Sequence, residues 1–399
     1  MKEKLRTIVL SSVITFLVCL FLVGGLVVYV ATGHGISSEL SYRTILSEIR
    51  YWVDRAAIRD FNEEDAVEGM IRGYLAAGLP DDRFATYYTA KEYAEVNQGS
   101  IGNFTGMGIE ILREENLSQG LFVRRVIGNS PAETAGLQVG DRIIACGDTD
   151  LRTLTYADAV LALRHQEGEE DTLRVLRSGE ELSFRIRFVT FTRRDTEYAI
   201  RGEIGYIRVY DFTEAADSQF SEAIRALKDA GVKGLILDLR GNLGGLLNVA
   251  RHMVDALVPK GEPIVTVAYK ESETVLYANE AEWFDVPIMV LVDNNSASAS
   301  ELVSSSLRDL RGARLVGTHT YGKQIGQTTY PLSSGGAVKL TTFRYYTKSG
   351  VNYQDIGLTP DVEVHLSEEK ERYLYALSPS EDDVYLKAKE ILLNELKGE

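Results

Sequence analysis

Cysteine is scarce in this chain of 399 residues, which contains only Cys19 and Cys146. Cys19 falls inside a long apolar run, so the two thiols are not expected to meet, and two cysteines are too few for a cysteine-based zinc site. Cys146 is expected to be a small buried hydrophobic residue rather than a nucleophile. The sequence therefore predicts no intrachain disulfide, no metal site and no cofactor.

Basic residues are also in deficit. The chain has 43 Lys and Arg against 58 Asp and Glu, a net charge of −15. Affinity for a polyanion comes from clustered Lys and Arg side chains that release counterions, so this balance argues against a nucleic-acid partner. The sequence also contains no internal repeat and no low-complexity tract. The 45% hydrophobic content indicates a folded protein, and the length suggests two or three domains.

One long stretch lacks charge altogether. Residues 8–31 form an apolar run of 24 residues, long enough to cross a hydrocarbon core of about 30 Å at about 1.5 Å per residue. Lys2, Lys4 and Arg6 precede the run and no Lys or Arg follows before Arg43, so the positive-inside rule predicts a cytoplasmic N-terminus. A cleaved signal peptide would have a shorter run and a clear cleavage site. We therefore expect a single-pass transmembrane helix that anchors an extracytoplasmic chain in the cell membrane.

Both ends of the remaining chain have helical patterns. In residues 36–100, apolar side chains recur at three- and four-residue spacings, Asn62 is placed to cap a helix, and Gly78-Leu79-Pro80 is placed to end it. The charged tail, residues 368–399, is expected to be helical, with an apolar side formed by Tyr375, Val384, Tyr385, Ala388, Ile391 and Leu392. These terminal helical segments are candidate surfaces for a homodimer.

Residues 101–190 instead predict short strands joined by turns. The loop Gly106-Met107-Gly108-Ile109 leaves successive backbone N–H groups uncovered, which suits a carboxylate, although such a loop alone is more often a simple turn. Together with the segment SPAETAGLQVGDRI, about 25 residues further on, the loop resembles that of a PDZ domain. The resemblance implies capture of peptide C-termini by strand addition, in a groove completed by a helix around Tyr156 to Leu163.

Residues 191–367 alternate between strands and helices. Apolar strands begin near Ile204, Gly234 and Val286, and each is followed by a helical pattern. This order predicts an α/β core with a largely parallel sheet that is buried on both faces. In such sheets, ligands bind beyond the carboxyl ends of the strands.

Two of these strand ends carry suggestive residues. The segment LDLRGNLGG, residues 237–245, has a Gly-x-x-Gly-Gly turn but lacks the spacing of a phosphate-binding loop. In DNNSASASE, residues 293–301, Ser298 falls at a strand-to-helix turn, and the amide of Ala299 points into the same space. Small residues beside a helix start are also explained by tight packing alone.

A serine hydroxyl is a poor nucleophile until a neighbouring base takes its proton. Among the five histidines, only His319 lies near a suggestive turn, and a Ser-His-Asp arrangement stays open on spacing alone. Lys323 is the better candidate, because it follows a glycine in a segment poor in charge, where burial would lower the pKa of the amine. Without further information, a serine and a lysine of this kind are usually packing and surface residues.

Three segments together change this interpretation. Residues 296–309, 316–327 and 340–364 resemble successive motifs of the carboxyl-terminal processing proteases, also called tail-specific proteases. Ser298 and Lys323 are 25 residues apart, the separation that this family uses between its nucleophile and its lysine. The similarity extends from about residue 40 to residue 364 and includes the PDZ-like region in its expected place.

The resemblance implies a role for each matching residue. Ser298 would attack the scissile carbonyl, Lys323 would take and return the proton, and Gln327 would orient the lysine by hydrogen bonding. The oxyanion would be held by the backbone N–H groups of Ala299 and of a glycine in the 237–245 segment, Gly244 or Gly245. The implied function is that of a membrane-anchored serine endopeptidase whose PDZ domain selects proteins or peptides with apolar C-terminal tails.

Three positions depart from the family pattern. Asn295 and Gln324 stand where the family usually has glycine, and His319 stands where an acidic residue is common. None of them belongs to the implied catalytic set. The alternative hypothesis is a catalytically inactive, PDZ-bearing extracytoplasmic adaptor whose protease core only binds.

Overall fold

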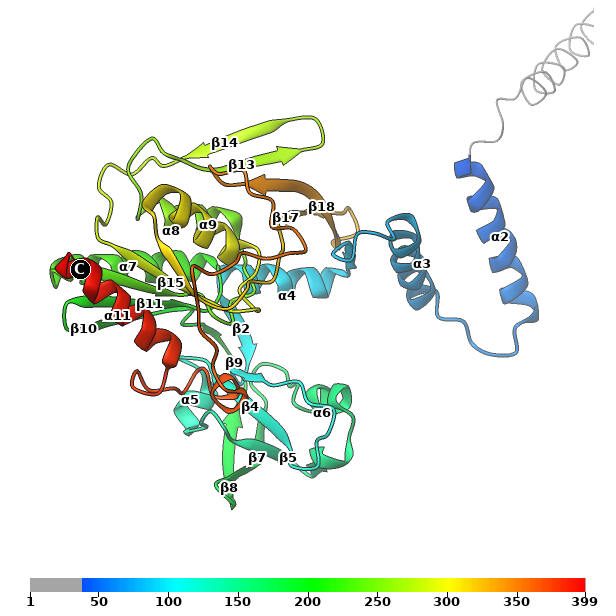
Figure 1. The fold of residues 1–399 in the computed structure, drawn as a ribbon. Coiled ribbons are helices and arrows are strands. Elements are labelled where there is room, and N and C mark those ends of the chain that lie inside the picture. Colours follow the sequence, from blue (N-terminus) through cyan, green and yellow to red (C-terminus); the bar gives the residue numbers. More distant parts are fainter. Residues whose placement is uncertain (1–37, 399) are drawn as a thin grey trace, which may run out of the picture. The chain divides into compact units, whose positions relative to one another are not determined.

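The computed structural model describes residues 38–398. None of the helices in this described range is both long enough and apolar enough to cross a membrane. The apolar run of residues 8–31, for which we predict a membrane anchor, lies outside the described residues. The chain divides into two compact units, one ending at Gly73 and the other beginning at Tyr74 (Figure 1).

The first unit is helical, as its periodicity predicts. It contains α2 (Ser38–Ala56) and most of α3 (Glu63–Gly78). The Asn62 side chain accepts hydrogen bonds from the backbone N–H groups of Glu64 and Asp65, so the predicted cap is confirmed. Helix α2 exposes an apolar stripe at three- and four-residue spacings, formed by Tyr42, Ile45, Leu46, Ile49 and Trp52. Pairing of two chains through such a surface stays a prediction.

The second unit is built on a six-stranded sheet, as expected for an α/β core. The strand order is β10-β11-β12-β15-β16-β19, and every neighbouring pair is parallel except β10 with β11. The strands are β10 (Thr196–Arg201), β11 (Ile204–Val209), β12 (Gly234–Asp238), β15 (Ile288–Val292), β16 (Arg314–Gly317) and β19 (Val362–Glu363).

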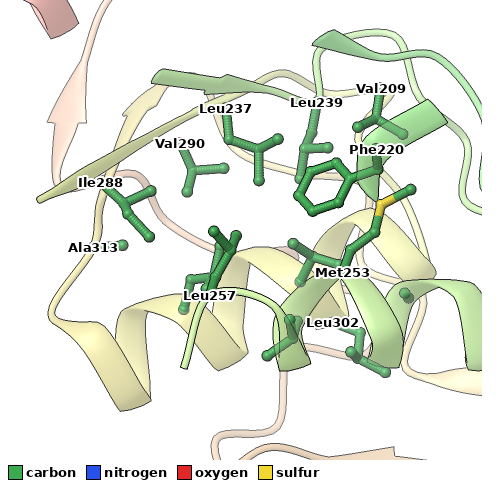
Figure 2. Close-up of a cluster of buried hydrophobic side chains, with 14 of the residues drawn as sticks. Val209, Phe220, Leu237, Leu239, Met253, Leu257, Ile288, Val290, Leu302 and Ala313 are labelled. Carbon is green, nitrogen blue, oxygen red and sulfur yellow. The ribbon is translucent and has the colours of Figure 1, made fainter. Parts of the chain in front are cut away.

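Both faces of this sheet are covered at its central strands β11, β12 and β15, which explains why these strands are buried without alternation. Leu237 and Val290 pack on one face against three helices, as Figure 2 shows for part of the cluster. Ile236 and Met289, one position earlier in each strand, pack on the other face against the C-terminal helix. The helices are α7 (Glu214–Asp229), α8 (Leu247–Asp255) and α9 (Ala299–Arg311) on the first face and α11 (Asp383–Lys397) on the second.

A second, antiparallel sheet lies over the α8 and α9 side of the core (Figure 1). Its long strand β18 (Ala337–Tyr346) pairs with β1, β13 and β17, and β13 continues to β14. These strands are β1 (Thr86–Tyr88), β13 (Pro263–Tyr269), β14 (Glu273–Tyr277) and β17 (Ile325–Pro331). The sequence pattern of residues 36–100 predicts only helix, so β1 is a correction: it forms by pairing with a strand about 250 residues further along.

The PDZ-like region forms its own sheet and core. The chain enters it through β2 (Asn103–Gly106) and leaves it through β9 (Val189–Thr192), which pair with each other. Its apolar cluster includes Leu121, Ile143 and Ile186. Helix α4 (Ala90–Ile101) precedes β2. The other elements of the region are β3 (Ile109–Ile111), β4 (Leu121–Val126), α5 (Pro131–Ala135), β5 (Arg142–Cys146), β6 (Thr149–Asp150), the 3-10 turn Leu151–Thr153, α6 (Tyr156–Ala162), β7 (Glu170–Arg177) and β8 (Glu180–Arg187).

The C-terminal tail is not one continuous helix, contrary to the prediction for residues 368–399. It contains the short helix α10 (Glu368–Arg372) and then α11 (Asp383–Lys397). Pro379 lies between them, where its ring and missing N–H disfavour a continuous helix. The apolar side of α11 is confirmed, since Val384, Tyr385, Ala388 and Leu392 are buried. Tyr375 lies outside both helices.

Candidate active site

Ser298 lies at the turn between strand β15 and helix α9. Its backbone has φ 55° and ψ −111°, a conformation that residues with a Cβ rarely adopt. Such strain is common where a nucleophile is presented at a strand-to-helix turn. The side chain is half-buried, and its hydroxyl donates no hydrogen bond to any residue in the described part of the chain. The Ser298 hydroxyl proton is therefore available to a base.

The two flanking serines have a different role. Ser296 Oγ donates to the carbonyl of Leu239 at 2.9 Å, and Ser300 Oγ donates to the carbonyl of Asn242 at 2.9 Å. Both serines are fully buried. The two serines thus fasten the Ser298 turn to the glycine-rich loop on both sides of Ser298.

Lys323 lies in the loop between β16 and β17. Its Nζ donates to Gln327 Oε1 at 3.0 Å and lies 4.1 Å from the centre of the Phe84 ring. Among the described residues it forms no ion pair. Burial lowers the pKa of Lys323, and the positive charges of Lys339 and Arg83 lower it further, against the opposing effect of Asp82 and Glu301. The structure thus brings Lys323 and Gln327 together, as predicted.

Glu301 joins the serine turn to the lysine loop. Its carboxylate accepts hydrogen bonds from the N–H groups of Ser298, Gly322 and Lys323 at 2.9, 2.7 and 2.8 Å and from the Thr320 hydroxyl at 2.6 Å. The side chain is fully buried, and this burial raises the pKa of Glu301 although the four hydrogen bonds act in the opposite direction. Sequence reasoning missed Glu301. The pattern Ser-x-x-Glu at a helix start is the signal that indicates it.

Tyr345, from strand β18, is a second residue that connects the Ser298 turn to the Lys323 loop. Its hydroxyl lies 3.0 Å from the carbonyl oxygen of Ser298 and 2.6 Å from that of Lys323, both acceptors for its single proton. The ring is 2% exposed, so this polar contact is shielded from water. Glu301 and Tyr345 together fix the relative position of the two loops that carry Ser298 and Lys323.

Of the proposed oxyanion donors, Gly244 and Ala299 lie beside Ser298. A Cβ on Gly244 would lie 2.9 Å from both Ser298 Cβ and the Ala297 carbonyl oxygen and 3.1 Å from the Ala299 nitrogen, so only glycine allows this approach. The N–H of Gly244 is engaged, because it donates to Asn242 Oδ1 at 2.9 Å. The N–H groups of Ala299 and Gly245 donate to no described residue. This geometry favours Ala299 and Gly245 as donors, with Gly244 required for close approach.

The positions that depart from the family pattern have structural roles. Gln324 is buried, accepts from the Tyr353 N–H at 2.8 Å and donates to the Val351 carbonyl at 3.0 Å. Asn295 donates its N–H to Asp293 Oδ1 at 2.9 Å within the turn. His319 is exposed and contacts the Thr359 hydroxyl at 3.1 Å, so the structure does not bring it to Ser298 as a base.

The PDZ-like loop has the geometry expected of a carboxylate-binding nest. Gly106 and Gly108 have φ values of 153° and 84°, and the carbonyls of Met107 and Gly108 accept from Ala132 and Ile127. The N–H groups of Met107 and Gly108 have no acceptor in the part of the chain that the structure describes. Strand β3, which starts at Ile109, is an edge strand and can pair with an added peptide strand. The Met107 side chain points into the core of this region.

One group of side chains has ligand types that metals use. Within residues 38–398, Cys146, His165 and Asp171 bring Sγ, a ring nitrogen and a carboxylate oxygen within 4.8 Å of one another. Asp171 accepts from the other two side chains, at 3.4 and 3.0 Å, and burial raises the pKa of the Cys146 thiol to about 12. A metal-ligating histidine normally donates its second N–H to an acceptor, but Nδ1 of His165 has none. These contacts are those of a hydrogen-bonded cluster.

Comparisons with known proteins agree with this architecture. Residues 203–364 match the model of peptidase family S41, and residues 99–176 match that of the PDZ domain. The carboxy-terminal-processing protease of Bartonella bacilliformis is 35% identical over 341 residues, covering 82% of this chain and 77% of that protein. The chain therefore belongs to peptidase family S41, a family of serine peptidases that includes carboxy-terminal-processing proteases.

Other relatives support the same family and fold. A probable CtpA-like serine protease of Staphylococcus aureus is 30% identical over 302 residues, which cover 75% of this chain but only 59% of that protein. The photosystem II D1 C-terminal processing protease has 25% identity and a TM-score of 0.52, with 85% of this chain and 91% of that one covered. A putative S41 protease from Bacteroides fragilis shares the fold, with 18% identity, a TM-score of 0.61 and coverage of 86% and 92%.

Proposed function

We propose that this protein is a membrane-anchored endopeptidase. It uses a Ser298–Lys323 dyad, supported by Gln327, to cleave extracytoplasmic proteins. One observation carries the proposal: the Lys323 amine is bonded to a neutral amide rather than a carboxylate, in a loop that Glu301 and Tyr345 tie to the Ser298 turn. An ion pair would favour the ammonium, whereas burial beside an amide favours the neutral amine. A neutral amine is what a general base requires.

The reaction follows from these groups. Lys323 takes the Ser298 hydroxyl proton as Oγ attacks the scissile carbonyl, and the N–H groups of Ala299 and Gly245 hold the resulting oxyanion. The Lys323 ammonium then gives its proton to the leaving amine, which departs as the tetrahedral intermediate collapses to an acyl-enzyme. Water hydrolyses the acyl-enzyme with Lys323 as the base again. Gln327 keeps Nζ directed throughout.

The PDZ domain is proposed to select substrates by their C-termini. A terminal carboxylate would accept from the free N–H groups of Met107 and Gly108, and the peptide backbone would pair with the open edge of β3. Apolar side chains of the tail would lie towards the helix α6, where Tyr156 packs on the PDZ core. Proteins with exposed apolar tails are therefore the expected substrate class.

A serine-directed fluorophosphonate probe tests the catalytic proposal. The full-length protein is expected to be labelled, Ser298→Ala to be unlabelled, and Lys323→Arg to be inactive because a guanidinium cannot be deprotonated in a protein. His319→Ala is the matched control and is expected to keep its activity. Loss of activity in His319→Ala, together with an active Lys323→Arg, would transfer the base to the histidine. An unlabelled wild type that still binds peptides would support the inactive adaptor.

The proposed topology has a separate test. Protease added to intact cells or spheroplasts should degrade the chain beyond residue 36 and spare the basic N-terminal tip, because Lys2, Lys4 and Arg6 are expected on the cytoplasmic side. Full protection of the large domain would contradict this orientation without affecting the catalytic proposal.

A further inference from the structure

The segment Asp82–Phe84 lies between α3 and β1, far from the catalytic residues in sequence and outside the matched S41 range. It reaches the site because β1 pairs with β18, placing Thr86 opposite Lys339. The preceding turn is held by a hydrogen bond from the Phe84 N–H to Asp82 Oδ1 at 3.1 Å. Residues that precede the PDZ domain in the chain thus contact the lysine that follows it.

Asp82 is the end of a chain of hydrogen bonds from Lys323. Lys323 Nζ donates to Gln327 Oε1 at 3.0 Å, and Gln327 Nε2 donates to Thr341 Oγ1 at 3.1 Å. The Thr341 hydroxyl donates to Asp82 Oδ1 at 2.8 Å, and the Thr341 N–H donates to Asp82 Oδ2 at 3.0 Å. The carboxylate thereby directs the hydroxyl proton, leaves the hydroxyl oxygen as an acceptor for Gln327 Nε2, and so turns Gln327 Oε1 towards the lysine.

Phe84 covers the same amine from another direction. Its half-buried ring has its centre 4.1 Å from Lys323 Nζ. An aromatic ring in this position excludes water, which disfavours an ammonium, and presents a negative π face, which favours one. The other charged groups that face the lysine are Lys339 on β18, Arg83 beside Phe84, Asp82 and Glu301. Burial is the largest influence on the pKa of Lys323, and the Phe84 ring lies against the buried amine.

We propose that Asp82 and Phe84 are positioning residues of the peptidase site, Asp82 by orienting Gln327 through Thr341 and Phe84 by controlling the environment of the Lys323 amine. The inference rests on the proposed Ser298–Lys323 mechanism and extends it to a part of the chain that precedes the PDZ domain. Asp82 and Phe84 would then belong to the peptidase site although they lie N-terminal to the PDZ domain.

Two Phe84 variants of the full-length protein test the role of the ring beside Lys323, because they separate water exclusion from the contact with the π face. Phe84→Leu keeps water out but removes the π face, so the pKa of Lys323 should fall and the acid limb of kcat/KM should move to lower pH. Phe84→Ala admits water, so that limb should move to higher pH. Trp283→Leu is the control, since it removes an equivalent contact, 4.0 Å from Arg311, at the other end of α9. It should leave the limb unchanged.

A pair of Thr341 variants tests the hydrogen-bond chain. Thr341→Val keeps the shape of the side chain but removes the hydroxyl, and should lower kcat roughly tenfold or more through misdirection of the base, with KM little changed. Thr341→Ser keeps the hydroxyl and should restore most of the activity. Thermal unfolding of each variant separates these effects from loss of fold.

The outcomes are distinguishable. Opposite shifts for the two Phe84 variants and rescue by Thr341→Ser support the inference. Unshifted profiles, or equal losses in both Thr341 variants, overturn it while leaving the dyad intact. An active Lys323→Arg overturns the proposed function itself, and with it any positioning role for Asp82 and Phe84.

Discussion

Strands β12 and β15 are neighbours that end at the same edge of the sheet, but the acidic residues beyond them are held in different ways. At the end of β12, Asp238 binds Arg240 at 2.6 Å, and Arg240 binds Asp382 at 2.6 Å. All three side chains are buried. Beyond β15, Glu301 is equally buried, yet its partners are three backbone N–H groups and one hydroxyl.

The pKa values of the two carboxyl groups reflect this difference. Burial raises the pKa of Asp238, but the charges of Arg240 and Arg208 outweigh it and hold the pKa well below its usual range. Burial raises the pKa of Glu301, and its neutral donors do not fully offset that effect. The first strand end is stabilised by paired charges. The strand end beyond β15 is organised without a cation. No ion pair with Glu301 therefore favours the ammonium form of Lys323.

The largest effect is expected from breaking the ion pairs beyond β12. Arg240→Met leaves Asp238 and Asp382 buried without their cation and should lower the free energy of unfolding by about 3–5 kcal/mol. Arg174→Met is the control, because the Arg174–Glu181 pair is exposed and such pairs contribute about 0–1 kcal/mol. Denaturant unfolding measures both. Equal losses for the two variants would mean that the buried pairs have no special role.

Glu301→Gln should have the next largest effect, and mainly on activity. The new amide donates where the carboxylate accepts from Ser298 and Lys323, so the two loops separate and kcat/KM should fall about a hundredfold. Stability should fall by about 1–3 kcal/mol, the cost of unsatisfied buried donors. Glu133→Gln, at the equivalent position of the capped helix α5 in the PDZ domain, is the control and should keep activity.

The same comparison predicts opposite pH dependences. Since folding raises the pKa of Glu301, its contribution to stability falls as pH rises from 4.5 through the raised value. Since folding lowers the pKa of Asp238, its contribution is lost as pH falls from 3.8 through the lowered value. Relative to wild type, Glu301→Gln should therefore become more stable as pH rises from 4.5. A constant difference across that range would contradict the raised pKa.

The sequence predicts most of this fold and the nucleophile, but not the supports. Apolar strands such as Ile288–Val292 are local signals that predict the parallel core, whereas the Lys323–Gln327 contact is implied by the family resemblance of the segments that carry Ser298 and Lys323. Tyr345 and Phe84 carry no local signal, because their contacts depend on β18 pairing with β1 and β13. The prediction of one helix over residues 368–399 is wrong because it overlooks a local signal: Pro379 interrupts an otherwise helical pattern.

A third change, Gln327→Glu, would give Lys323 a charged partner like the one that Arg240 has in Asp238. Gln327→Glu replaces the neutral partner of Lys323 Nζ with a carboxylate about where Oε1 now accepts. An ion pair there favours the ammonium, so the pKa of Lys323 should rise and the acid limb of kcat/KM should move to higher pH. Activity at pH 7 should fall more than tenfold, at about 1.4 kcal/mol for each tenfold change. Unchanged activity at pH 7 would mean that the lysine is not the base.

The smallest effect concerns the PDZ loop, whose backbone N–H donors could hold a peptide carboxylate. Glu301 is a carboxylate permanently held by backbone donors, whereas the PDZ loop presents the N–H groups of Met107 and Gly108 without an acceptor among the described residues. A peptide with a free apolar C-terminus should therefore bind more tightly than its amidated form, by about 1.5 kcal/mol or roughly tenfold for a hydrogen bond to a charged group. Calorimetry measures the difference.

Gly108→Ala is the matched change in the protein: at φ 84° its Cβ would lie 2.2 Å from Ser130 Cβ, so the loop must move and the preference for the free carboxylate should disappear. Equal affinities of the wild type for both peptides would remove the PDZ loop from tail recognition.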